Sequence, residues 1–293
     1  MSESTIPVDL RNPGQVFGCL GLVELAEVLM KAPCVCRFNY SGLDTNVTFT
    51  LQADAEADPV ATVVQFLRDA RAATLIPAGM NLSTKKWDVE EIIGNGRQSE
   101  CLPPKTPATL PVLLQADGVR VVLDHWADEG QSGRDNVKFW AGAGGYPGSA
   151  LTRDVLRLIG RLKAEIIESA VRDPFSVESA MTSSFRFDWR RDYIPLDAGF
   201  SPNDHGDVTM VGYPFTEILA VAGLQYARPA RVTKRDKLQY RYAVSSALLP
   251  TPLARVALGA IDVGFPLRTF RMILGWPGKA GQARCIIDAQ EEL

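Results

Sequence analysis

The sequence predicts an α+β protein made of two ferredoxin-like halves (RRM-like, of the RAMP type), each with the order β-α-β-β-α-β, and an inserted region between them. Two observations lead to this fold class. Residues 1–78 and 181–293 each alternate short strands with helices in a similar order, whereas residues 79–180 hold a hairpin, a glycine loop and a long helix. We therefore expect an N-terminal half at 1–78, an insertion at 79–180 and a C-terminal half at 181–293.

The N-terminal half is predicted from its periodicity. Apolar side chains recur with helical spacing over residues 16–30. Asp58-Pro59 is typical of a helix start, because aspartate caps the first turn and proline is tolerated in it. Ser41-Gly42 separates two alternating patterns, as in a hairpin. The predicted elements are strands at 5–10, 34–40, 46–51 and 74–77 and helices at 16–30 and 58–71.

The insertion begins with an irregular stretch at 78–111 that contains Lys85-Lys86-Trp87 and a cluster of prolines. An irregular stretch of this length inside a compact protein is either functional or mobile. Asp117-Gly118, which follows, is the strongest hairpin signal in the sequence. The predicted elements are strands at 110–115 and 119–126 and a long helix at 149–171.

A glycine loop precedes that long helix. A predicted strand at 136–140 leads into four glycines between positions 142 and 148, and Ser149 is placed to cap the helix. Bare backbone N–H groups with a helix dipole behind them favour a phosphate. The spacing matches neither GxxxxGK[ST] nor GxGxxG, so a nucleotide site is not indicated, and a tight turn is the alternative. The residues expected at a phosphate contact are Arg134, Lys138, Trp140, Gly142, Gly144 and Gly145.

The C-terminal half repeats the order of the first. Its apolar helix resembles the first one, since residues 218–224 match residues 16–22 in small and apolar side chains. Any buried helix uses such residues, so a duplication is a hypothesis. The predicted elements are strands at 183–189, 208–211, 238–244, 267–274 and 283–287 and helices at 214–226 and 251–260.

Rings and cations alternate in the C-terminal half in a way that suits nucleic acid. Residues 185–193 interleave aromatic side chains with arginines, a mixture that stacks bases and neutralises phosphates. Residues 228–241 are strongly basic, and residues 263–287 contain a second glycine loop and no acid. Core packing of the rings and simple turns are the alternatives. The residues expected to contact nucleic acid here are Arg186, Arg190, Arg191, Arg231, Lys234, Arg235 and Lys279.

The charge distribution suits a subunit with one basic working face. Residues 181–287 contain 14 Lys or Arg and 8 Asp or Glu, a net charge of +6, whereas the whole chain carries −3. The rest of the chain is therefore acidic and predicts a surface for partner proteins, with chance clustering as the alternative.

Composition narrows the class of protein. An apolar fraction of 46% and a charged fraction of 22% are typical of a soluble globular protein. No uninterrupted apolar run approaches the roughly 18 residues that cross a bilayer, and the first residues lack a basic secretory region, so we expect a cytoplasmic protein without membrane contact. Five cysteines without a CxxC spacing and two histidines predict no metal site and no cofactor.

An enzyme would need a base, and the sequence offers few. His205 lies in a polar loop and is the better placed of the two histidines to activate a ribose 2′-hydroxyl for metal-independent RNA cleavage. Motifs of hydrolases, kinases and metalloproteases do not occur. A lone histidine is more often structural or solvated than catalytic. A guide-RNA processing endoribonuclease is therefore the alternative to a non-enzymatic role.

Four segments resemble a family encoded beside the effector genes of subtype I-G (formerly I-U) CRISPR–Cas systems. They are NPGQVFGCLGL at 12–22, DNVKFWAGAGGYP at 135–147, FRFDWRRDYIPLDAGFSPN at 185–203 and GWPG at 275–278. The resemblance implies a subunit or accessory of the RNA-guided surveillance complex (Cascade), in which ferredoxin-like RNA-binding folds are common. It carries over no catalytic residue set.

Together these features predict a non-enzymatic subunit that contacts the backbone of guide RNA or target DNA and packs against other Cascade subunits in antiviral defence. In such complexes base pairing with the guide recognises the target sequence, and the protein contacts the nucleic-acid backbone and recognises the shape of the duplex. A scaffold without nucleic-acid contact is the remaining alternative.

Overall fold

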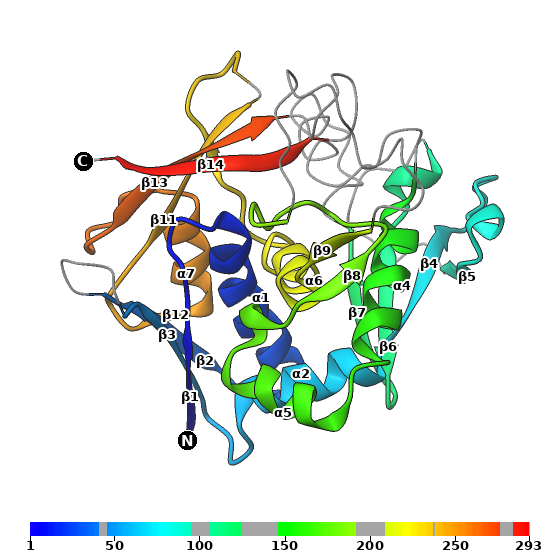
Figure 1. The fold of residues 1–293 in the computed structure, drawn as a ribbon, viewed down its shortest axis with the longest axis horizontal. Coiled ribbons are helices and arrows are strands. Elements are labelled where there is room, and N and C mark those ends of the chain that lie inside the picture. The colour runs from blue at the N-terminus through cyan, green and yellow to red at the C-terminus, as the bar shows by residue number, and fades with distance from the viewer. Residues whose placement is uncertain are drawn as a thin grey trace.

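The computed structural model describes residues 1–40, 46–94, 106–124, 146–191, 209–236, 238–275 and 284–292. Within these ranges the protein is a mixed α+β fold in which helices pack among several small sheets (Figure 1). This confirms the α+β class. The glycine loop and its flanking cations, at 134–145, lie outside the described residues.

The N-terminal sheet has the strand order β1-β3-β2-β12 and is antiparallel throughout. Asn12 and Asp58 cap its two helices by accepting from backbone N–H groups, and Asp58 does so at the predicted position. The elements are β1 (Ser2–Pro7), α1 (Pro13–Met30), β2 (Cys34–Asn39), β3 (Thr48–Ala53) and α2 (Pro59–Asp69), joined by the distant β12 (Leu249–Pro250).

The next strand, β4 (Arg71–Pro77), leaves this sheet. In a ferredoxin-like half it would pair with β1, but it pairs with two other strands. Ala70 alone connects α2 to β4, so β4 starts at the end of the 11-residue helix far from Ser4, which contacts the other end at Asp58. The middle sheet has the order β5-β4-β6-β7, with β5 (Glu90–Gly94), β6 (Val112–Ala116) and β7 (Val119–Leu123).

In the middle sheet one predicted turn is confirmed, and one stretch that was predicted to be irregular contains regular structure. Asp117 and Gly118 both have positive φ, as the predicted tight hairpin requires. The stretch predicted to be irregular contains β5, which pairs in parallel with β4, and short 3₁₀ turns at Lys85–Trp87 and Pro107–Thr109. A five-residue strand gives little local signal by its periodicity.

The predicted long helix is two helices, α4 (Gly148–Ile159) and α5 (Ala164–Arg172). The chain turns between them after Gly160, where the backbone approaches the carbonyl group of Arg68 at the end of α2. Ser149 is not the cap, because Pro147 occupies that position and Ser149 is buried in the first turn, where its hydroxyl accepts from Thr74 at 2.8 Å.

The C-terminal sheet has the order β10-β11-β13-β14. Residues 183–189 are not a strand, and a short strand just before them pairs with β9 instead. The elements are β8 (Ser179–Met181), β9 (Met210–Gly212), α6 (Pro214–Gly223), β10 (Ala230–Arg231), β11 (Gln239–Val244), α7 (Thr251–Leu258), β13 (Arg268–Gly275) and β14 (Cys285–Glu292), with a 3₁₀ turn at Pro174–Ser176.

Helices α1 and α6 cross at the centre of the molecule (Figure 1). A Cβ at Gly21 would clash with the carbonyl group of Leu219, and a Cβ at Gly223 would clash with the carbonyl group of Phe17. The close contact between the two helices is therefore reciprocal. By length and composition α1 could cross a membrane, but 78% of it is buried inside the fold, as in the core helix of a soluble protein.

Candidate nucleic-acid interface

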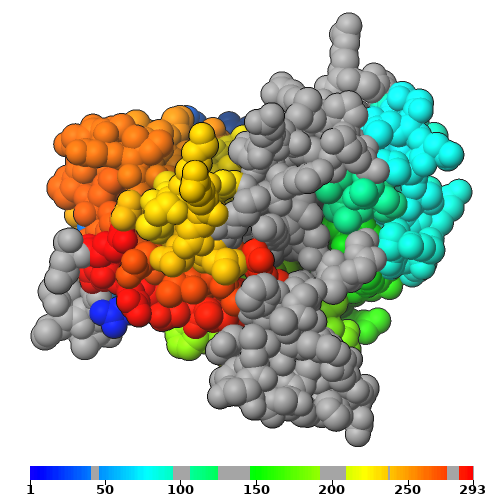
Figure 2. Space-filling model, turned by 90° about the horizontal axis from the view of Figure 1, so that it is seen from above, coloured from blue at the N-terminus to red at the C-terminus, as the bar shows by residue number. Residues whose placement is uncertain are grey.

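Five described cations gather at one end of the C-terminal sheet, which we call the basic end: Arg186, Arg231, Lys234, Arg235 and Arg284. The sheet register brings them together, because Gln239 pairs with Ile273 and Cys285 pairs with Gly275. The loop that carries Lys234 and Arg235 therefore leaves the sheet at the end where Arg284 enters it. Figure 2 shows this loop (yellow) beside β13 and β14 (orange to red) on one face.

Tyr240 shows how close two of these cations are. Its hydroxyl is buried, and burial raises its pKa, while the charges of Arg231 and Arg284 act in the opposite direction. Arg231 in β10 and Arg284, just before β14, therefore lie near the same phenol. Because sequence positions 231 and 284 are remote, only the folded sheet reveals that they are neighbours.

The two ends of the C-terminal sheet differ in charge balance. Away from the basic end, the arginines are paired: Arg268 forms a two-bond contact with Glu291 at 2.6 and 2.8 Å, and Arg241 pairs with Glu292. At the basic end Arg231 donates to the carbonyl group of Lys234 at 3.1 Å, and Asp236 is the one acid in the loop that carries Lys234 and Arg235. An excess of positive charge concentrated at one edge attracts polyanions.

Arg186 joins the basic end through its backbone. Its carbonyl group accepts from the N–H of Ile286 in β14 at 3.3 Å, and its N–H donates to the Ser184 hydroxyl. Its φ is 68°, in the left-handed region that non-glycine residues rarely adopt. Such backbone strain persists only where the surroundings hold it. The predicted strand fails here because of this conformation.

Arg190 and Arg191 hold the interior together. Arg190 donates to both carboxylate oxygens of Asp188 and, at 2.8 Å, to the carbonyl group of Phe175, and its guanidinium lies 3.6 Å from the centre of the Tyr213 ring. Arg191 is buried and donates to the carbonyl group of Met181. Both guanidiniums serve the packing of the protein, whereas Lys234 and Arg235 at the basic end are exposed and Arg186, Arg231 and Arg284 are half-buried.

Two of the aromatic side chains of 185–189 are also buried, and the third is exposed. Phe185 and Phe187 are fully buried, stacked on each other at 6.3 Å and packed against the helix core near Phe17. They cannot stack on a base. Trp189 is 39% exposed. Of the rings described in this segment, Trp189 is the one that a ligand can reach.

A buried carboxylate lies beneath this segment. Glu217 of α6 is fully buried and accepts from the backbone N–H groups of Phe187 and Asp188, both at 3.2 Å. Burial raises the pKa of Glu217 to about 7, assisted by the nearby Asp188 charge and opposed by the two N–H groups and Arg191. Asn12, the cap of α1, donates to the Asp188 carboxylate at 2.9 Å. The network ties 187–188 to both central helices.

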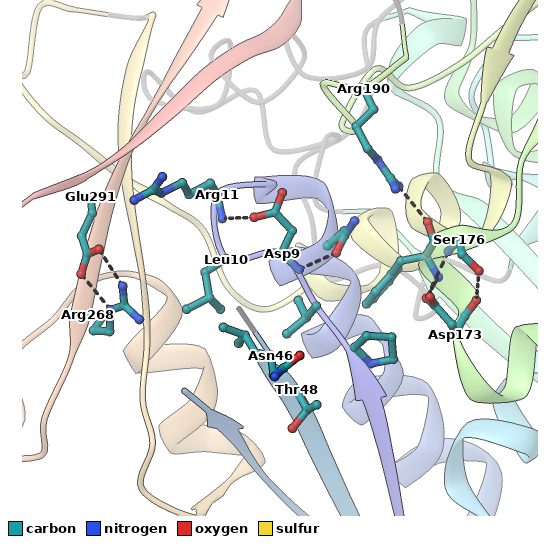
Figure 3. A pocket seen from close by; sticks show the side chains of 15 residues that line it. Asp9, Leu10, Arg11, Asn46, Thr48, Asp173, Ser176, Arg190, Arg268 and Glu291 are labelled. Atoms are coloured by element: carbon teal, nitrogen blue, oxygen red, sulfur yellow. Dashed lines mark hydrogen bonds and ion pairs between the residues drawn. The ribbon is translucent and has the colours of Figure 1, made fainter. Parts of the chain in front are cut away.

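A groove lined by residues from both ends of the chain runs beside β14. It consists of two cavities of about 800 and 630 Å³ that share Arg11 and Glu291. Figure 3 shows the larger one, with Arg11 reaching across toward the strand that carries Glu291 and with Arg190 on the far side. Trp189 and five successive residues of β14, 287–291, line the smaller one. Sequence reasoning did not find this groove, because its walls come from both ends of the chain.

A second groove, of about 850 Å³, also contains cations that the sequence analysis did not select. Arg68, Arg71, Lys85, Arg153 and Arg157 line it together with three acids. Arg157 pairs with Asp88 at 3.1 Å, and Arg153 donates to backbone carbonyl groups. The carboxyl ends of α2 and α4, which repel anions, also meet here. The balance of charge is less favourable to phosphate than at the basic end.

The remaining predicted site residues lie outside the described residues. They are Arg134, Lys138, Trp140, Gly142, Gly144, Gly145, Lys279 and the alternative catalytic residue His205. The described part of the chain holds no cluster of three His, Cys, Asp or Glu side chains that could bind a metal ion.

No family model matches the chain, and no curated protein and no solved structure resembles it significantly.

Proposed function

We propose that this protein is a non-enzymatic, cytoplasmic subunit of a type I-G CRISPR surveillance complex that contacts the backbone of guide RNA or target DNA through the basic end. The observation that carries the proposal is the convergence of Arg186, Arg231, Lys234, Arg235 and Arg284 on one end of a single sheet. Cations that neutralise phosphates bind without regard to sequence, which suits a subunit whose sequence information comes from a guide.

The finer fold assignment belongs to the same proposal. Three strands of the N-terminal sheet, β1-β3-β2, have the order of a ferredoxin-like half, and the reciprocal contact of Gly21 and Gly223 supports two related halves. On this view β4 has moved from the first half to the middle sheet. The resemblance of residues 12–22 and 185–203 to the CRISPR-associated family agrees with the burial of Asn12 and Asp188 in one network.

Oligonucleotide binding at a series of salt concentrations tests the proposal. We expect Lys234→Ala/Arg235→Ala to weaken binding of a 20-nucleotide RNA and to reduce the slope of log Kd against log salt by about 1 to 2, roughly one unit for each lost phosphate contact. Arg120→Ala/Arg161→Ala removes two exposed cations elsewhere and serves as the matched control. Equal slopes for both variants and wild type would remove the basic end from the proposal.

A further inference from the structure

We propose that the groove beside β14 receives unpaired nucleotides and that Trp189 is the ring on which a base stacks. This inference rests on the proposed function and adds to it a preference for single-stranded over double-stranded nucleic acid. It depends on three features of the described residues: the exposed Trp189, the open edge of β14 and the distribution of charge along the groove.

The groove continues directly from the basic end. The carbonyl group of Arg186 bonds to Ile286, and the chain then leaves β14, so that the groove opens along residues 287–291 with Trp189 on its wall. β14 is the last strand of its sheet, which leaves its outer edge bordering the groove. The hydrogen bond between Arg186 and Ile286 therefore places the basic end next to the part of β14 that lines the groove.

The groove walls separate sites for phosphates from sites for bases. Arg11 lines both cavities, and no ion pair of its guanidinium is found among the described residues. Asp288 and Gln290 line the opposite wall, where Gln290 donates to Asp288 at 2.9 Å, and the neighbouring Glu291 is paired with Arg268. Carboxylates repel phosphates but accept from base amino groups. We infer that the backbone follows Arg11 and that bases point toward β14.

A duplex does not satisfy this geometry. Its bases are stacked on each other inside the helix and cannot lie against Trp189, whereas single strands expose their faces to aromatic side chains. Asp288 on one wall also opposes a duplex, which would bring phosphates of both strands into the groove. The preference for unpaired nucleotides follows from the ring and this carboxylate together.

Binding of a 10-nucleotide single-stranded RNA and of the matching duplex to ring variants tests the inference. We expect Trp189→Ala to weaken single-strand binding about tenfold, Trp189→Phe to retain most of it and neither to change duplex binding. Tyr226→Ala removes a ring that is 62% exposed in the turn after α6 and is the matched control. Arg11→Ala should weaken single-strand binding independently of the ring and lower its salt dependence.

The outcomes separate this inference from the proposed function. If binding depends on Lys234 and Arg235 but not on Trp189 and Arg11, the groove assignment is wrong and the basic end stands. The same conclusion follows if Trp189→Phe loses as much as Trp189→Ala, or if duplex binds as tightly as single strand. If the wild type binds neither RNA, both proposals fail. Circular dichroism melting confirms that each variant is folded before its affinity is compared.

Discussion

At the scale of single residues, the role predicted from the sequence and the role in the structure differ most in residues 185–191. Residue types alone predicted that this segment contacts phosphates and bases of nucleic acid. In the structure Phe185, Phe187 and Arg191 are buried, and Arg190 is bound to Asp188. The same pattern of rings and arginines can occur in an exposed strand or in an irregular segment that packs over two helices. The left-handed Arg186 distinguishes them, and it is visible only in three dimensions.

Arg190 illustrates the consequence for mutagenesis. Because Asp188 is fully buried, Arg190→Ala leaves a carboxylate without its guanidinium, and we expect a loss of about 2–3 kcal/mol in the free energy of unfolding. Urea denaturation measures this loss. Arg172→Ala, on the exposed end of α5, is the control and should change stability by less than about 0.5 kcal/mol. A stable Arg190→Ala protein with impaired RNA binding would restore the original assignment.

Glu217 predicts an unusual dependence of stability on pH. Its pKa is about 7 in the folded protein and near 4.5 when unfolded, so between these values the folded state holds more protons. Stability therefore falls as the pH rises from about 4.5 to about 7 and is then constant with respect to this group.

Replacing the carboxyl group tests this dependence. We expect Glu217→Gln, which keeps an acceptor for the N–H groups of Phe187 and Asp188, to be stabilised relative to wild type at pH 8 by up to about 3 kcal/mol and by much less at pH 5. Denaturant titrations at both pH values measure the difference. Glu168→Gln, on the exposed face of α5, should show no such pH dependence; the same gain at both pH values would contradict the account.

At the scale of elements, local signals predicted what local chemistry controls. The Asp58 cap and the Asp117-Gly118 turn are determined by neighbouring residues and occur where expected. The division of the long helix at Gly160 was missed, because the turn depends on packing against α2. The departure of β4 was also missed, since strand pairing depends on partners far away in sequence.

The crossing of α1 and α6 leaves no room for a side chain at Gly21 or Gly223. We expect Gly21→Ala and Gly223→Ala each to destabilise the protein by about 3 kcal/mol or more, because the added methyl group meets backbone that cannot move aside. Thermal unfolding measures the effect. Gly160→Ala, where the approach is looser, should cost much less. If all three substitutions were equally mild, the close contact of the central helices would be refuted.

At the scale of the whole molecule, the candidate site combines residues that lie far apart in the sequence. The basic end combines cations from three separate stretches between residues 186 and 284, and the groove beside it joins Arg11 to Trp189 and β14. Sequence analysis identified the stretches that form the basic end, because composition is local, but it identified neither Arg11 nor residues 287–291. It could not show that Arg231 is more accessible than Arg191, because the exposure of a side chain depends on the whole fold.

Ultraviolet crosslinking of the protein to single-stranded RNA, followed by mass spectrometry of the crosslinked peptides, tests the central claim most directly. We predict crosslinks at Trp189 and in residues 231–240 and 284–291, with Lys234→Ala/Arg235→Ala reducing their yield. Crosslinks concentrated instead on α5, or on the groove between α2 and α4, with residues 231–240 free of RNA, would contradict the assignment of the basic end as the nucleic-acid interface.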